Sequence, residues 1–536
     1  MKTDQHRLSI KEKIGYALGD GAANIAWRGV ATFLFIFYTD VFGLGPGTVG
    51  LIFLVARFSD GISDILMGIL GDNTKSKYGK FRPWILWTAI PLGLILALLF
   101  TTPDFNNSGK IIYAYVTYIL FTLIYTANNI PYGALMGVMT PNDVERTSLG
   151  SYRMAGAFAG GMLVQVTLLF LVAHFGNINP KVDISAMANG SYKVQVESPT
   201  DIQYADLSTE DGLVTFTPLS NELTAETTSP NTRQSFSMTA GESYAFIAES
   251  NQELTRDAIT VIDQKQGYST SMYIMAALLS LLMFLTFLFT RERVLPPAHQ
   301  SFDIVEDFKN LITNKPWWIL LVIGLLFNIY NAIKQGIVII YFTHYLGDAL
   351  LSASYLFGLG IASIVGALAT AYLSTLMGKR NLFILALLLS GFLNALIIFC
   401  GPDDIGFIFG LGIVSEFASA MFPTLFFVML GDAADYSEWK NGRRATGLVY
   451  SAGSFATKLG GGIAVFIIGI VLQSYGYIGQ DQSAIESAFP GIKMLMSWIP
   501  SIVTIIATGL MLAYPLTSKK MGDISSDLIN RRQLSQ

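Results

Sequence analysis

Residues 54–73 read LVARFSDGISDILMGILGDN, an apolar segment with charged side chains inside it. A helix needs about 20 apolar residues to cross a hydrocarbon core of about 30 Å. Arg57, Asp60 and Asp64 lie within that length. Because a charge near the centre of a bilayer is costly, such charges mark functional positions. The stretch therefore predicts a membrane helix with a functional charge cluster.

Similar apolar windows recur along the 536 residues of the chain. Only 13% of the residues are charged, whereas about 25% are charged in soluble globular domains. The windows long enough to span a membrane lie near residues 22–42, 48–72, 83–102, 111–136, 149–174, 269–290, 316–344, 352–377, 382–400, 405–431, 446–474 and 491–515. We therefore predict an all-α membrane protein with twelve transmembrane helices.

Lysine and arginine residues gather at both ends of the chain and in alternate short loops. Cytoplasmic loops are enriched in these residues, so both termini are predicted to be cytoplasmic, which agrees with an even number of spans. The first 20 residues lack the short apolar region and cleavage site of a signal peptide. We expect a multi-pass protein of a bacterial inner membrane.

Residues 175–268 form a polar insertion between the fifth and sixth windows. It holds 13 acidic and 5 basic residues, a net charge of −8. Runs such as YKVQVES alternate apolar and polar residues, which is typical of half-buried strands. We predict a small β-rich extracytoplasmic domain.

The windows and the insertion together predict the organisation of the chain. It consists of helices one to five in 1–174, the insertion in 175–268, helix six in 269–290, a cytoplasmic connection between two bundles in 291–315, helices seven to twelve in 316–515 and a cytoplasmic tail in 516–536.

Residues suited to enzymatic chemistry are sparse. Cys400 is the single cysteine and the four histidines are scattered, which argues against a disulfide or a metal cluster. We expect no enzymatic activity, no cofactor and no nucleic-acid partner. The expected partners are a small solute, a coupling cation and membrane lipid, and the expected state is a monomer.

The two acidic residues of the opening stretch share one helix face. Asp60 and Asp64 are four residues apart, which places them about 6 Å from each other. Two carboxylates in a low dielectric repel each other unless they share a proton or a bound cation. Ser63 adds a hydroxyl oxygen, so we predict a site for Na+ or H+. The alternative is that Asp60 forms an ion pair with Arg57, one turn earlier.

Basic residues inside other windows need partners. Arg153 lies in the fifth window and Lys458 in the eleventh, with Asp60 and Asp64 as candidate partners across the bundle. An ion pair that can be displaced would couple solute binding to cation binding; the alternative is a permanent salt bridge. Lys334, in the seventh window, is expected to extend toward an interface.

The fourth window contains a polar and aromatic cluster, LIYTANNIPYGAL. Sugars bind through stacking on aromatic rings and through hydrogen bonds to amides, arginine and carboxylates. The alternative for each residue is packing between helices, but the clustering favours a binding site. Residues of the first and fifth windows offer the same chemistry. The candidate sugar ligands are Asn24 and Trp27 of the first window, Tyr125, Asn128, Asn129 and Tyr132 of the fourth, and Arg153 of the fifth.

Two loops combine acidic and basic residues in a way that suggests gating latches. The first follows the second window in GDNTKSKYGKFRPW, and the second follows the tenth window in GDAADYSEWKNGRR. The alternative is the ordinary enrichment of positive charge in cytoplasmic loops. The candidate gating residues are Asp72, Lys75, Lys80 and Arg82 in the first loop and Asp432, Asp435, Arg443 and Arg444 in the second.

At these motifs the chain resembles the glycoside–pentoside–hexuronide:cation symporters, a branch of the major facilitator superfamily. Matching stretches include KEKIGYALGDGAANI, YTANNIPYGAL and DYSEWKNGRRATG, and they occur in both halves. The resemblance implies two six-helix bundles, alternating access and import of a small glycoside or oligosaccharide with Na+ or H+. It is closer to the xyloside and oligosaccharide branch than to the melibiose carrier.

The resemblance also assigns roles to individual residues. It implies cation ligands at Asp60, Asp64 and Thr126, with Ser63 replacing an asparagine. It also implies sugar or coupling roles for Tyr125, Arg153 and Lys458. Arg57, one turn before Asp60, is a further candidate for coupling. Asn24, Asn129 and Gly133 stand where the melibiose carrier has two aspartates and a tryptophan, so galactoside specificity is not implied. The alternatives are a carrier of a non-sugar substrate and a membrane sensor that uses the insertion.

Overall fold

The computed structural model describes residues 8–140, 143–178, 180–187, 190–209, 214–219, 233–250, 253–293, 312–441 and 446–534. The chain folds as two compact units. Unit 1 consists of Met1–Pro296, Val338–Leu356 and Gly469–Ile492. Unit 2 consists of Pro297–Ile337, Phe357–Ile468 and Lys493–Gln536.

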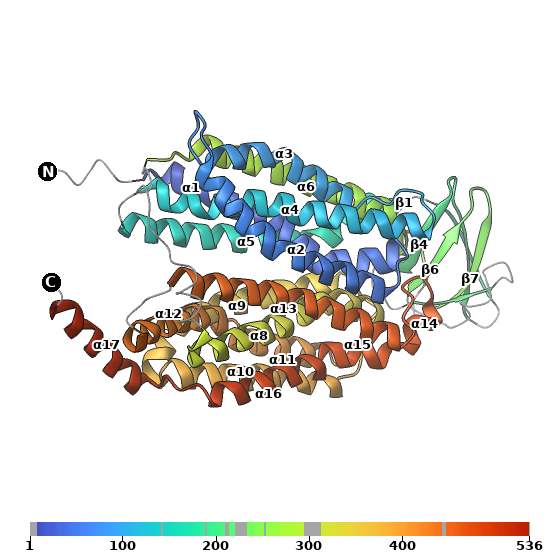
Figure 1. Cartoon of the computed structure of the whole chain (residues 1–536). Helices are drawn as coiled ribbons and strands as arrows, with labels where there is room; N and C mark the ends of the chain where they lie inside the picture. The colour runs from blue at the N-terminus through green and yellow to red at the C-terminus, as the bar shows by residue number, and fades with distance from the viewer. Residues whose placement is uncertain are drawn as a thin grey trace. The chain divides into compact units, whose positions relative to one another are not determined.

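The long helices of unit 1 begin at capping residues or prolines. Ser9 and Glu12 form a capping box at the start of the first helix. Asn106 and Asp263 accept bonds from first-turn amides, and Pro46 occupies a first-turn position that tolerates it. The helices are α1 (Ile10–Ile36), which continues as the π-helical turn η1 (Phe37–Val41), α2 (Pro46–Asn73), α3 (Arg82–Leu99), α4 (Asn107–Met139), α5 (Asp143–Gly176) and α6 (Gln264–Phe289) (Figure 1).

Helices α1 and α5 approach each other closely through glycines. A Cβ atom at Gly156 would lie 2.1 Å from the carbonyl oxygen of Ala17, and one at Gly160 would lie 2.0 Å from that of Gly21. Only glycine permits so close a contact between helix backbones. The contact brings Arg153, one turn before Gly156, against α1.

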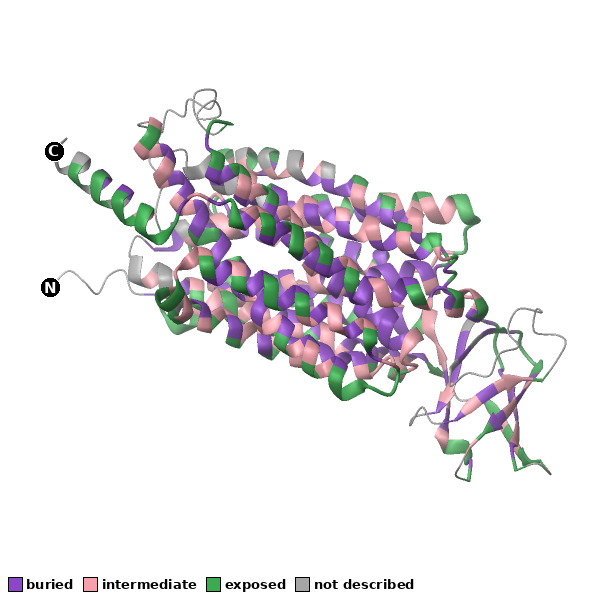
Figure 2. Cartoon of the chain, turned by 90° about the horizontal axis from the view of Figure 1, so that it is seen from below, coloured by how far each residue is buried: buried purple, intermediate pink, exposed green. Residues whose placement is uncertain are grey.

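The insertion is β-rich, as predicted. Its strands are β1 (Asn177–Ile178), β2 (Lys181–Ala186), β3 (Tyr192–Glu197), β4 (Ile202–Thr209), β5 (Thr215–Pro218), β6 (Arg233–Met238), β7 (Ser243–Glu249) and β8 (Ile259–Asp263). They form two antiparallel sheets, ordered β1-β8-β4-β6 and β2-β3-β7-β5. Val194, Leu207, Phe216 and Val261 are fully buried in its core. Figure 2 shows buried and exposed positions interleaved along these strands, at one end of the helices of unit 1. We call this end the insertion end.

Unit 2 is helical, and stacked aromatic rings hold its core together. The rings of Phe327 and Phe422 are 3.5 Å apart, and Phe426 stacks on Phe422. Its helices are α8 (Lys315–Ile340), which continues as η3 (Tyr341–Tyr345), α9 (Leu351–Met377), α10 (Lys379–Leu396), α11 (Ile405–Ser419), α12 (Met421–Asn441), α13 (Thr446–Ser474), α15 (Phe489–Met496), α16 (Trp498–Leu512) and α17 (Ser518–Leu534). The last turns of α8 and α13 and the first turns of α9 and α15 belong to unit 1, together with η3 and the short α14 (Gln482–Ser487).

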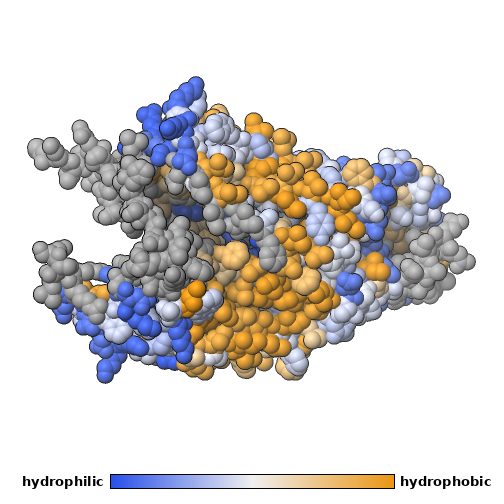
Figure 3. Space-filling model, in the orientation of Figure 1, coloured by the Kyte–Doolittle hydropathy of each residue, from blue (hydrophilic) through white to orange (hydrophobic). Residues whose placement is uncertain are grey.

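Within the described ranges, ten helices have the length and hydropathy needed to cross a membrane. Large apolar side chains cover their outer surfaces, as at Ile90 and Leu368, which are 66% and 74% exposed. Figure 3 shows apolar side chains gathered along the middle of the helices, with hydrophilic ones toward the helix ends.

The first two predicted windows are occupied by α1 and α2, which are not among these ten helices. Three polar or charged residues, Asp20, Asn24 and Arg28, lower the hydropathy of α1. Helix α1 begins at Ile10, well before the predicted start at residue 22.

Candidate functional site

The charged stretch of α2 forms a buried ion pair in unit 1. Arg57 Nη1 donates to Asp60 Oδ2 at 2.8 Å. The two residues are only 6% and 4% exposed. Asp60 Oδ1 has no hydrogen-bond partner among the described residues. The structure therefore contains the ion pair that was the alternative to a cation site, and it leaves one carboxylate oxygen available.

The second carboxylate of α2 contacts α4. Thr126 Oγ1, which is buried, donates to Asp64 Oδ1 at 3.1 Å. Ser63 Oγ donates to the backbone oxygen of Asp60 at 3.0 Å. Three of the four predicted cation ligands thus lie within two turns of α2, and Thr126 of α4 contacts one of them, Asp64. Carboxylate and hydroxyl oxygens are suitable ligands for a hard cation.

Aromatic rings surround the guanidinium group of Arg57. The guanidinium carbon lies 4.6 Å from the ring centre of Trp27, and that ring lies 5.5 Å from the ring of Tyr125. Arg57 Nη2 also donates to the hydroxyl of Tyr118 at 3.4 Å. The structure therefore places Trp27 and Tyr125, two predicted sugar ligands, next to the charges of α2. Tyr118 lies outside the polar cluster of the fourth window and escaped prediction.

Arg153 pairs with an aspartate that the sequence analysis did not single out. Its Nε atom donates to Asp20 Oδ2 at 3.1 Å, and Asp20 is buried. Asn24 Nδ2 donates to the backbone oxygen of Asp20 at 2.9 Å. Asp60 and Asp64, the predicted partners of Arg153, were therefore the wrong choice. The glycine contact between α1 and α5 places Arg153 opposite Asp20 instead.

Two predicted sugar ligands take part in helix packing. The ring of Tyr132 stacks on Tyr16 at 4.6 Å, and its hydroxyl donates to the backbone oxygen of Tyr16 at 2.6 Å. Asn128 Nδ2 donates to Thr88 Oγ1 at 2.7 Å, and Asn128 is buried. Asn129 remains half-buried. A Cβ atom at Gly133 would meet no atom within 4 Å, so there is open space beside this part of α4.

The loop of the first predicted latch is bound by an acidic residue that was not predicted. Glu292, after α6, accepts bonds from the amides of Lys80 and Arg82 at 2.9 Å each, and from that of Phe81 at 2.8 Å. Arg82 Nη2 donates to the backbone oxygen of Phe287 at 2.7 Å. These contacts hold the loop to the end of α6. Lys75 is exposed, and the side chain of Asp72 is outside the described part of the structure.

The second predicted latch also has an unexpected partner. Asp432 accepts two bonds from Lys379 Nζ, at 2.8 and 2.7 Å. Lys379 begins α10, so the pair joins α10 to α12. Asp435 is half-buried, and Arg443 and Arg444 fall outside the described residues. The pairing of Asp432 with those arginines therefore remains a prediction that this structure does not test.

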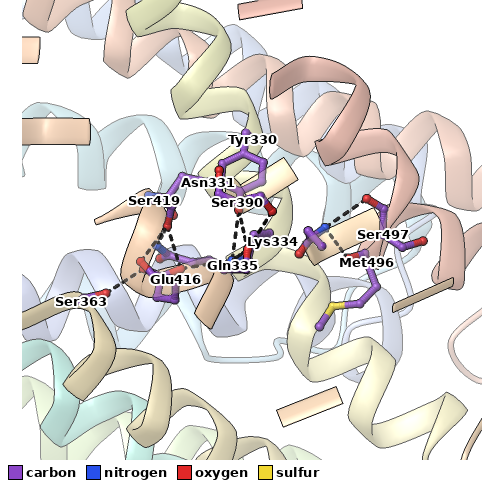
Figure 4. A network of polar contacts seen from close by, with 12 residues as sticks. Tyr330, Asn331, Lys334, Gln335, Ser363, Ser390, Glu416, Ser419, Met496 and Ser497 are labelled. Carbon is purple, nitrogen blue, oxygen red and sulfur yellow. Dashed lines mark hydrogen bonds and ion pairs between the residues drawn. The ribbon is translucent and has the colours of Figure 1, made fainter. Parts of the chain in front are cut away.

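Unit 2 contains a second buried charge pair, shown in Figure 4. Lys334 Nζ lies 3.2 Å from Glu416 Oε2 and Lys334 is only 2% exposed. Ser363 and Ser419 donate to the Glu416 carboxylate at 2.7 and 3.2 Å. The prediction that Lys334 extends to an interface was wrong, because its ammonium group is buried and pairs with Glu416 inside the unit. Lys458 lies in α13 of unit 2, so its predicted pairing with α2 stays a prediction.

The sequence matches a known family over most of its length. A family model described as "MFS/sugar transport protein" matches residues 15–196 and 219–518. In Escherichia coli (strain K12), YagG, whose name includes "glycoside/cation symporter", is 28% identical, over 98% of this chain and 96% of the relative. "Inner membrane symporter YicJ" from the same strain is 29% identical, over 99% and 97%. The "Isoprimeverose transporter" of Lactiplantibacillus pentosus is 28% identical, over 92% and 85%.

Solved structures confirm the fold. A bacterial homolog of the human lysosomal transporter Spinster superimposes with a TM-score of 0.65 at 11% identity, over 96% of this chain and 99% of that chain. This similarity agrees with the ten helices of the described ranges that are long and apolar enough to cross a membrane. The chain therefore belongs to the MFS/sugar transport protein family, as the resemblance to the glycoside–pentoside–hexuronide:cation symporters predicted.

Proposed function

We propose that this protein imports a small glycoside or oligosaccharide together with Na+ or H+ by alternating access. The observation that carries the proposal is the cluster on α2. Asp60 and Asp64 share a helix face in a membrane-spanning unit, and Thr126 contacts the second of them. Asp60 keeps a buried oxygen that has no hydrogen-bond partner among the described residues. Such charges inside a membrane helix mark ion pathways.

The ion pair of Arg57 with Asp60 offers a route for coupling. A cation or proton that binds Asp60 reduces its negative charge and weakens its hold on Arg57. Arg57 also contacts Trp27 and Tyr118. Release of the guanidinium group therefore changes the surface next to Tyr125. In this mechanism, cation occupancy alters the shape and charge of the neighbouring sugar site.

The sugar site is proposed to lie between α1, α4 and α5. Trp27 and Tyr125 supply aromatic faces. The Arg153 and Asp20 pair supplies charged hydrogen-bonding groups of both signs, which can hold the hydroxyl groups of an uncharged sugar. The open space at Gly133 favours a sugar larger than a single ring. The names of the relatives, which include an isoprimeverose transporter, support this substrate class.

Reconstituted vesicles test the proposal. Purified protein in proteoliposomes is given labelled xylobiose under an inward Na+ gradient, an inward proton gradient or no gradient. We expect accumulation above equilibrium under one of the two gradients, which also identifies the cation. If neither gradient drives accumulation while the sugar still equilibrates, the protein is a uniporter and coupling is excluded. If no glycoside equilibrates, the substrate class is wrong.

A further inference from the structure

The insertion and the helices of unit 1 enclose a cavity of ≈ 590 Å³. This volume falls within the range of about 300–1,000 Å³ that is typical of small-molecule sites. Strands β4 and β8 form one wall through Asp206, Thr209 and Thr260. Phe170 of α5 and Tyr268 of α6 form another. The cavity is separate from the residues around Asp60, none of which lines it.

Asp40 of η1 lies at the boundary between this cavity and a cluster of polar contacts. Its Oδ2 atom lies 2.6 Å from His344 Nε2 of η3, and its Oδ1 atom accepts a bond from the hydroxyl of Tyr477 at 2.8 Å. A Cβ atom at Gly479 would lie 2.2 Å from Asp40 Oδ1, so glycine is required there. A ligand in the cavity would therefore touch Asp40 and His344, whose contacts join the ends of α1, α8 and α13.

Three residues of the cavity wall hold polar atoms that lack partners. Thr209 Oγ1, Thr343 Oγ1 and Gln480 Nε2 are shielded from water and have no hydrogen-bond partner within the described ranges. Thr209 and Thr343 are only 6% and 5% exposed. A buried polar atom without a partner is unfavourable. A ligand rich in hydroxyl groups would supply these partners once the side chains rotate toward it.

The charge of the cavity restricts the ligand further. Its described lining includes four aspartates and two histidines, but neither lysine nor arginine; these residues are Asp40, Asp206, Asp257, Asp348, His174 and His344, of which His344 contacts Asp40. In the part of the chain that the structure describes, no three acidic, histidine or cysteine residues converge to hold a metal ion. Hydroxyl groups can donate to the carboxylates, and Phe170 and Tyr268 offer flat apolar surfaces. An anionic ligand would be repelled by the aspartates.

We propose that this cavity is a second saccharide site, at the insertion end, which admits uncharged saccharides and rejects uronides. The proposal rests on the proposed function and adds a substrate class to it. The site would bind the sugar before it reaches the residues between α1, α4 and α5. The insertion would thus act as a filter for charge at the entrance of the transporter.

Uptake of labelled xylobiose by right-side-out membrane vesicles tests the site. Thr260→Trp fills the cavity from the insertion, and we expect the KM for xylobiose to rise by about tenfold or more. Ser243→Trp is the matched control, because Ser243 is exposed on the other sheet and lies outside the cavity. A wild-type KM in Thr260→Trp would overturn the proposal while leaving symport intact. Absence of saccharide uptake by the wild type would instead overturn the proposed function itself.

A charge reversal tests the filter independently. Asp257→Lys is expected to raise uptake of methyl glucuronide relative to xylobiose severalfold. Glu253→Lys, an equal change at an exposed position outside the cavity, is expected to leave the ratio unchanged. An equal ratio in both variants would show that the cavity does not select by charge. Because Asp257 is exposed, its substitution is compatible with folding.

Discussion

Replacing Asp60 with asparagine removes the charge that Arg57 pairs with at 2.8 Å. The two side chains are only 6% and 7% exposed, so the guanidinium charge is left buried. Breaking one partner of a buried pair costs about 3–5 kcal/mol. Arg57 retains its contacts with Trp27 and Tyr118, so we expect a loss near the lower end, about 3 kcal/mol in the free energy of unfolding.

The double variant Arg57→Gln, Asp60→Asn removes both charges and is expected to recover most of that loss. Unfolding of the purified wild type, both single variants and the double variant in detergent gives a double-mutant cycle. We expect a coupling energy of at least about 2 kcal/mol, since partners in direct contact are not additive. Additivity within about 0.5 kcal/mol would refute the view that this pair is stabilising.

The same variants separate a structural pair from a coupling site. If Asp60 also carries the cation, the double variant is stable but no longer accumulates sugar against a gradient. If the pair is only structural, the stable double variant accumulates sugar like the wild type. Ser59→Ala on the same helix is a suitable control, because its hydroxyl donates to the backbone oxygen of Ala56 within its own helix.

Other contacts give further expectations. Arg153→Lys should raise the KM for sugar by about tenfold or more, since lysine lacks the planar guanidinium group that pairs with Asp20. A KM equal to that of the wild type would show that Arg153 is not part of the sugar site. Glu292→Gln weakens three bonds to the start of α3, so hydrogen exchange of those amides should accelerate and the free energy of unfolding should fall by about 1.5–3 kcal/mol. Unchanged exchange would show that Glu292 does not hold the start of α3. Glu416→Gln should destabilise by about 3–5 kcal/mol, and Lys334→Met added to it should restore most of the loss. A Glu416→Gln protein as stable as the wild type would mean that the pair contributes nothing.

The membrane helices and the β-rich insertion were predictable from the sequence because they depend on local patterns. Apolar runs give the helices, and alternating residues give the strands. The charged residues of α2 were also predictable, since a charge within an apolar run is visible without any tertiary information. Their common helix face follows from a spacing of four residues.

The partners of these charges depended on contacts between helices that no local pattern contains. Asp20 was overlooked because the first window was started at residue 22, whereas the capping box at Ser9 begins α1 much earlier. Glu416 sits in an apolar run that gave no reason to connect it to Lys334, 82 residues away. Glu292 lies in a loop whose charges resemble ordinary cytoplasmic enrichment. In each case the contact is set by how segments that are distant in the sequence pack together.

Accumulation of labelled xylobiose in proteoliposomes, compared between the wild type and Asp64→Asn under an inward Na+ or proton gradient, tests the central claim most directly. Asp64 lies in the predicted cation site but outside the Arg57 ion pair, so its neutral variant leaves that pair in place. We predict that the wild type accumulates sugar above equilibrium, and that Asp64→Asn still equilibrates sugar but does not accumulate it. Accumulation by Asp64→Asn equal to that of the wild type would contradict cation coupling at α2.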